Sequence, residues 1–159
     1  MKDQGVKKFM RLALSEARKN FKEMKGGPFG ACLVKNGKVI AVSRNTVLAN
    51  DATCHAEVNA IREASKVLGG FDLSGCEIYS TTEPCPMCFS AIHWAKIDKV
   101  FYGTGIKDVA KRGFNELAIS NREMKKIGGS KVRIVSGFLR EECLNLLEGW
   151  DGVTGKELY

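Results

Sequence analysis

The chain has 159 residues, of which 44% are hydrophobic and six are cysteines, and its formal net charge is +7. This length fits one domain, residues 1–159, whose core can fold without disulfides, so a small disulfide-stapled secreted scaffold is excluded. No stretch resembles a signal peptide or is apolar for long enough to cross a bilayer, so we expect a cytoplasmic protein with reduced thiols.

The first third of the chain predicts a helix, a hairpin and a second helix. Apolar residues recur at steps of three and four across residues 6–24, which predicts an amphipathic helix with a basic outer face. Two apolar runs at 31–34 and 39–43 flank an Asn-Gly pair, the usual two-residue hairpin turn. A second helix is expected over 53–68, where a glycine pair follows it.

The remainder alternates between strand and helix patterns. We expect strands at 77–81, 99–102 and 132–136, and helices at 85–96, 109–119 and 139–150. A strand, a helix and a strand in succession imply a parallel crossover, so the predicted fold class is α/β.

Two short motifs point to chemistry: His-x-Glu at 55–57 and Pro-Cys-x-x-Cys at 84–88. Cys85 and Cys88 stand three residues apart, so the start of one helix brings both sulfurs to one point. With His55 they form a set of three zinc ligands, which leaves a fourth tetrahedral position for water. Glu57 is then placed to take a proton from that water and pass it to a departing nitrogen.

A Cys-x-x-Cys pair alone would also fit a structural zinc site or a redox pair. The chain has no second such pair, and a non-catalytic zinc module would have no use for Glu57. His-x-Glu followed by Pro-Cys-x-x-Cys is the signature of zinc deaminases. The other cysteines are expected to be small core residues: Cys32, Cys54, Cys76 and Cys143.

Five stretches of the sequence carry a family resemblance: 27–31 (GPFGA), 45–47 (NTV), 55–58 (HAEV), 83–88 (EPCPMC) and 113–116 (GFNE). In this order they resemble the cytidine deaminase-like superfamily and, within it, the bacterial guanine deaminases. The resemblance implies a three-layer α/β/α fold with a mixed five-stranded sheet and a homodimer. It also implies one Zn²⁺ on the three ligands, with Glu57 as proton shuttle.

The same resemblance implies contacts to a purine base. It assigns Asn45 to hydrogen bonding with the base, Phe29 and Trp94 to aromatic walls, and the backbone of Ala56 to an amide donor. Three of them have a simpler explanation, since Asn45 would suit a strand-end turn and the two aromatic residues an ordinary core.

Two further substrate residues are implied near the end of the chain. Glu116 corresponds to an acidic position that recognises the ring nitrogens of guanine, although it would also fit an exposed helical charge. Tyr159 ends a tail that corresponds to one exchanged between protomers to close the pocket, although chain ends are often disordered.

The predicted reaction is the hydrolytic deamination of guanine to xanthine and ammonia. The alternative within the same chemistry is a tRNA adenosine deaminase producing inosine, because residues 133–147 resemble the last strand and helix of those enzymes. The positive charge gathers in residues 1–25 and 96–130, which would then contact phosphates instead of forming solvated helix faces. Deamination of cytosine is a further alternative.

Overall fold

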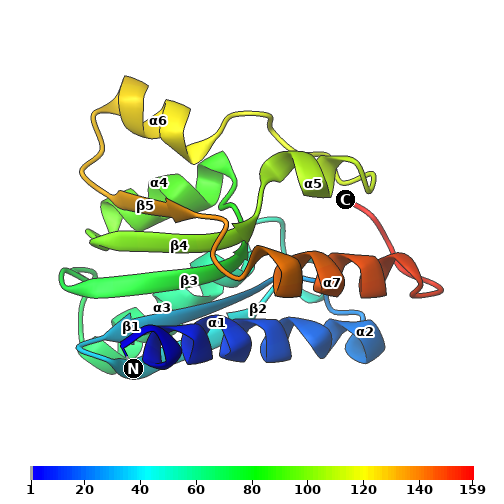
Figure 1. Ribbon diagram of the computed structural model, residues 1–159, viewed down its shortest axis with the longest axis horizontal. Coiled ribbons are helices and arrows are strands. Elements are labelled where there is room, and N and C mark those ends of the chain that lie inside the picture. Colours follow the sequence, from blue (N-terminus) through cyan, green and yellow to red (C-terminus); the bar gives the residue numbers. More distant parts are fainter. Residues whose placement is uncertain (1) are drawn as a thin grey trace.

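A computed structural model describes residues 2–159 and contains a mixed five-stranded sheet in the order β2-β1-β3-β4-β5 (Figure 1). The first three neighbours in this order are antiparallel, whereas β3, β4 and β5 run parallel. The strands are β1 (Gly30–Lys35), β2 (Lys38–Arg44), β3 (Cys76–Thr82), β4 (Lys99–Thr104) and β5 (Arg133–Ser136).

Helices cover both faces of the sheet. In Figure 1, α1 (Lys2–Arg18) and α7 (Arg140–Asp151) lie in front of the sheet, while α3 (Ala56–Leu68) and α4 (Pro86–Trp94) lie behind it. Next to α4 is α6 (Asn121–Gly128), and the short helical elements are α2 (Asn20–Glu23), η1 (Val47–Ala49) and α5 (Ile106–Ala110). Among the described residues, no helix has the length and apolar character that crossing a membrane requires.

The central strands are buried on both faces, which explains their continuous apolar sequences. On β1, Leu33 packs into the cluster beneath α3 and α4, whereas Cys32 packs into the cluster beneath α1 and α7. On β3, Ile78 and Tyr79 divide in the same way. The predicted three-layer α/β/α architecture with a mixed five-stranded sheet is therefore confirmed.

Most predicted elements occur with ends shifted by a few residues, but the helix expected over 109–119 is wrong. The structure has α5, which ends at Ala110 near the start of that range, and irregular chain from Gly113 to Ser120. Gly113 adopts a φ of 90°, which interrupts a helix, and Phe114 is buried against distant aromatic rings and against Leu147 and Trp150 of α7. The predicted first helix is also divided, because α2 forms a separate turn after α1.

Sequence reasoning missed α6 altogether. This helix has only eight residues, and Met124 and Ile127 are its large apolar side chains, so the apolar spacing was too short to identify it. A local signal was present, since Ser120 and Glu123 form a capping box at its start.

Candidate metal centre and substrate cavity

The three predicted ligands converge at the starts of two helices. His55 is the N-cap residue of α3 and Cys85 is the N-cap residue of α4, with Cys88 one turn later. Pro86 occupies the first turn of α4, where a missing amide donor costs little. The crossover from β3 to β4 places this helix start at the carboxyl end of β3, beside the start of α3.

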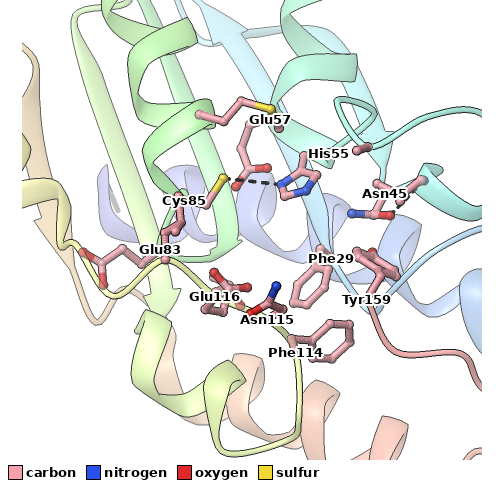
Figure 2. A pocket seen from close by; sticks show the side chains of 15 residues that line it. Phe29, Asn45, His55, Glu57, Glu83, Cys85, Phe114, Asn115, Glu116 and Tyr159 are labelled. Atoms are coloured by element: carbon pink, nitrogen blue, oxygen red, sulfur yellow. Dashed lines mark hydrogen bonds between the residues drawn. The ribbon is translucent and has the colours of Figure 1, made fainter.

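The spacing of the ligand atoms fits one zinc ion. Donor atoms of His55, Cys85 and Cys88 all lie within 4.8 Å of one another. The Nδ1 atom of His55 is 3.6 Å from the Sγ atom of Cys85, as the dashed line in Figure 2 shows. Donors bound at about 2.0 Å (N) and 2.3 Å (S) to a tetrahedral zinc would lie about 3.6 Å apart.

The electrostatics of the ligands also call for a cation. A hydrogen bond from the Cys88 thiol, opposed by burial and aided by His55, lowers the pKa of Cys85 to about 4. Donating that bond, together with burial, raises the pKa of Cys88 well above its ordinary value. Burial lowers the pKa of His55, but contact with Cys85 and nearby acidic groups raises it overall. One sulfur is thus acidified by the other, and a divalent cation held by the three ligands would supply the charge that stabilises both as thiolates.

Glu57 lies beside the ligands without belonging to the set. Its side chain is buried, and burial raises the pKa of its carboxyl group. Its Oε1 atom is 2.8 Å from the Ser80 hydroxyl, which is itself 2.6 Å from the Thr82 carbonyl oxygen. Ser80 can donate to Glu57 when that residue is ionised, or accept from it and donate to Thr82 when Glu57 is protonated. Both protonation states of a proton shuttle are thus accommodated.

A cavity of about 340 Å³ opens in front of these residues (Figure 2). Aromatic walls and polar groups from separate parts of the chain line it. The lining residues are Phe29, Asn45, Val47, Ala52, His55, Glu57, Thr82, Glu83, Cys85, Met87, Phe114, Asn115, Glu116, Leu117 and Tyr159.

Four of the predicted substrate residues meet in this cavity. Phe29, Asn45, Glu116 and Tyr159 come from four distant segments and face the same space (Figure 2). Ala56 is fully buried at the first position of α3, next to His55, and its side chain belongs to the core.

Trp94 is placed differently from its prediction as a pocket wall. It is the last residue of α4, is 77% exposed and does not line the cavity. The physical reason is its position in the helix, because the cavity lies at the N-terminal end of α4 and Trp94 at the opposite end. The four cysteines expected in the core are all buried with free thiols.

Asn45 is held by a buried polar network. Its side-chain Oδ1 atom accepts a hydrogen bond from the Val47 backbone N–H at 3.1 Å, and its backbone N–H donates to the Phe29 carbonyl oxygen at 3.0 Å. The fully buried Asn20 donates from Nδ2 to the carbonyl oxygens of Asn45 and Gly27, at 2.8 and 2.9 Å. Sequence reasoning missed Asn20 because an isolated asparagine near a helix end gives no sign of such distant partners.

The tail closes one side of the cavity of its own chain. The Tyr159 hydroxyl accepts a hydrogen bond from the Gly27 amide at 2.9 Å, and the Tyr159 carbonyl accepts one from Asn115 at 3.1 Å. Phe114 contacts both Tyr159 and Phe29 edge to face, with ring centroids 5.5 and 5.2 Å apart. Phe114 was another site residue that sequence reasoning missed, although it lies two residues before Glu116.

Glu116 is the carboxylate on the far side of the cavity from Asn45 (Figure 2). Burial, together with the negative charge of Cys85, raises its pKa to about 7. Among the side chains that the structure describes, those of residues 6–159, none forms an ion pair or a hydrogen bond with the Glu116 carboxylate, so its oxygens are available to a ligand.

The α/β/α fold places one imidazole and two cysteine sulfurs beside a buried glutamate. This combination of fold and site is that of a zinc-dependent nucleobase deaminase. The sequence model of the family described as the cytidine and deoxycytidylate deaminase zinc-binding region matches residues 3–104. The chain belongs to this family and is a zinc-dependent hydrolase.

Relatives of two kinds are similar to the chain. It is 39% identical over 152 residues to the guanine deaminase of Bacillus subtilis (strain 168), covering 95% of this chain and 97% of the relative. It is 35% identical over 144 residues to the tRNA-specific adenosine deaminase of the same strain, covering 89% and 86%. A solved structure of guanine deaminase from Nitrosomonas europaea has a TM-score of 0.82 at 28% identity, covering 91% of this chain and 84% of that one.

Proposed function

We propose that the chain hydrolyses guanine to xanthine and ammonia. The observation that carries this proposal is the placement of Glu116 in the wall of the cavity opposite Asn45, with no ion-pair or hydrogen-bond partner for its carboxylate among the described side chains. Free guanine offers ring N–H donors to such an acceptor. Adenosine in a polynucleotide has no ring N–H group, so its ring would leave the carboxylate without a donor.

The residues of the cavity divide the work of the reaction. Zinc, when held by His55, Cys85 and Cys88, lowers the pKa of water and so supplies a nucleophile at neutral pH. Glu57 accepts a proton at a carboxylate oxygen and delivers it to the amino nitrogen that leaves carbon 2 of the base as ammonia. The Ser80 hydroxyl orients this carboxylate in both of its protonation states.

The remaining side chains hold the base. Phe29 and Phe114 form an apolar wall that excludes water from the ring plane of the bound base. Asn45 and Glu116 supply hydrogen-bonding groups on opposite sides of the cavity, and Tyr159, at the end of the tail, closes the side next to Phe29. Orientation by several fixed groups is what brings the amino-bearing carbon toward the metal centre.

Substitution of Glu116 by glutamine tests this proposal. We expect the kcat/KM for guanine to fall at least about tenfold, because a carboxylate acceptor is replaced by an amide whose NH₂ group opposes the N–H donors of the base. Zinc content should be unchanged. Glu148→Gln, on the exposed side of α7, removes the same charge outside the cavity and serves as the control. Undiminished guanine turnover in Glu116→Gln would contradict the role proposed for Glu116.

Adenosine in tRNA is the second candidate substrate, favoured by the similarity to tRNA-specific adenosine deaminases. Guanine, guanosine, adenine, cytosine and tRNA should be incubated with the protein in parallel, with ammonia release measured. Inosine formation in tRNA together with salt-sensitive tRNA binding would replace guanine by this candidate. Ammonia from cytosine alone would favour the pyrimidine alternative.

This proposal predicts a small purine base as the ligand. We also propose that the protein is a homodimer and is located in the cytoplasm. Six free cysteines support a reducing compartment. The tail contacts its own cavity here, and exchange of the tail between protomers is a separate prediction. Light scattering of the full chain and of a variant lacking residues 156–159 would measure whether assembly depends on the tail.

A further inference from the structure

Glu83 is a buried acidic residue whose contacts the reaction outlined above does not use. It follows β3 and lies two residues before the ligand Cys85, with only 9% of the residue exposed. Its backbone amide donates to the Thr104 carbonyl at 2.7 Å, which fixes it between the ends of β3 and β4. The residue therefore sits between the metal ligands and the sheet.

The carboxylate of Glu83 accepts hydrogen bonds from two backbone amides that lie far apart in sequence. The Ile106 amide donates to Oε2 at 3.3 Å, and the Asn121 amide donates to Oε1 at 2.9 Å. These are the first residues of α5 and α6, so one carboxylate joins the starts of both helices. A third tie comes from the Nδ2 atom of Asn121, which donates to the Pro84 carbonyl at 2.6 Å.

Between these two anchored amides runs the segment that forms one wall of the cavity. We call residues 106–121 the wall segment; it carries four cavity-lining residues, Phe114, Asn115, Glu116 and Leu117. Within the described part of the chain, the backbone of residues 114–119 makes one hydrogen bond outside the segment, from Asn115 to Tyr159. Asp108 and Arg112 tie the first half of the segment to Arg140 and Asp151 of α7, and Phe114 packs on aromatic rings and on α7. The position of residues 115–119 therefore depends on these contacts and on the two ends of the segment.

A role of Glu83 as a simple helix cap does not explain this arrangement. The start of α6 has its own cap, since the Ser120 hydroxyl accepts from the Glu123 amide and the Ser120 amide donates to Glu123 Oε2. At the start of α5, the Gly105 amide donates to Asp108 Oδ2 at 2.8 Å. Both helices have local partners at their starts, so the second set of contacts fixes where the starts lie relative to the metal ligands.

We propose that Glu83 is a positioning residue that sets the distance between the zinc ligands and the substrate-recognising wall segment. Through this one carboxylate, the ligand-bearing turn at 83–88 and the carboxyl group of Glu116 are held in one frame. The inference deepens the proposed function, because the wall segment is the part of the site to which base recognition is assigned. Glu83 therefore affects binding of the base through the wall segment, and we expect its substitution to change KM.

The test is Glu83→Gln, which keeps the shape but leaves one acceptor oxygen for two amide donors. We expect the KM for the substrate base to rise about tenfold, the factor that corresponds to one lost hydrogen bond to a charged group. The kcat should stay within about threefold of wild type. Zinc content should be unchanged, and hydrogen exchange at residues 114–120 should be faster. Glu123→Gln weakens the local cap of α6 alone, where the Ser120 amide is its partner, and should change neither KM nor exchange at residues 114–119.

A second variant tests the same contact from the donor side and guards against misfolding of the first. Ile106→Pro removes one amide donor at the first position of a helix, where proline is tolerated, and leaves the carboxylate intact. Ile106→Pro should raise KM, as Glu83→Gln does. Loss of kcat or zinc in Glu83→Gln with unchanged KM and exchange would overturn the inference, since Glu83 would then act on the metal ligands alone.

The exchange measurement separates this inference from the proposed function. If guanine is not a substrate, KM is measured with whichever base releases ammonia in the parallel assay, and the exchange of residues 114–120 needs no substrate. Unchanged exchange in both variants would overturn the positioning role whatever the substrate. Faster exchange with no guanine turnover in wild type would reject guanine and retain the role of Glu83.

Discussion

Gly26 tests how closely the position of Asn45 controls activity. A Cβ atom at residue 26 would lie 2.1 Å from Oδ1 of Asn45 and 2.7 and 2.8 Å from its carbonyl oxygen and carbon. Two of these three atoms belong to the backbone, so a rotamer change cannot relieve the overlap. The substitution Gly26→Ala must therefore displace Asn45 or the glycine segment itself.

The magnitude follows from the overlap. Restoring ordinary contact requires a shift of about 1 Å, and a misplacement of that size in a substrate-positioning group costs on the order of 100-fold in rate. Overpacking a buried site costs about 1–3 kcal/mol of the free energy of unfolding. We therefore expect kcat/KM for guanine to fall about 100-fold in a protein that still folds and binds zinc.

The assay is ammonia release over a range of guanine concentrations, with zinc content and urea unfolding measured on the same preparation. Gly70→Ala is the matched control, because a Cβ atom there would meet nothing within 4 Å. Activity of Gly26→Ala within about threefold of wild type, with the expected loss of stability, would refute the idea that Asn45 must be held in place for catalysis.

Three further predictions concern the metal centre and the network behind Asn45. Glu57→Gln should lower kcat at least about 100-fold and retain zinc; loss of zinc along with activity would mean that Glu57 supports the metal instead. Removal of zinc by a chelator should abolish ammonia release and make the partly exposed Cys85 reactive toward thiol reagents, and added zinc should reverse both effects, whereas activity surviving complete metal removal would contradict the assigned chemistry. Asn20→Leu should lower the free energy of unfolding by about 2–4 kcal/mol in urea denaturation, since two buried carbonyls lose their donor, and an effect no larger than that of the exposed Asn145→Leu would show that the network contributes little.

The sequence by itself determined the features that depend on neighbouring residues. The hairpin follows from Asn36-Gly37, which adopt φ angles of 50° and 72° that an Asn-Gly pair accepts readily. The ligands follow from the Cys-x-x-Cys spacing at a helix start, where backbone geometry alone brings Cys85 and Cys88 together. The buried strands follow from their apolar runs, which helices cover on both faces of the sheet, and the parallel crossover follows from the strand–helix–strand order.

Only the tertiary structure decided the shape of the cavity. Phe29, Glu116 and Tyr159 lie in different segments, and no local pattern states that their side chains face one space. The helix predicted over 109–119 is absent because Gly113 interrupts it and Phe114 packs on the rings of Phe29 and Tyr159. Trp94 lies at the end of α4 opposite the ligands, which hydrophobic periodicity could not predict. Local spacing specifies a metal site because its donors are close in sequence, whereas a cavity forms from contacts between residues that only folding brings together.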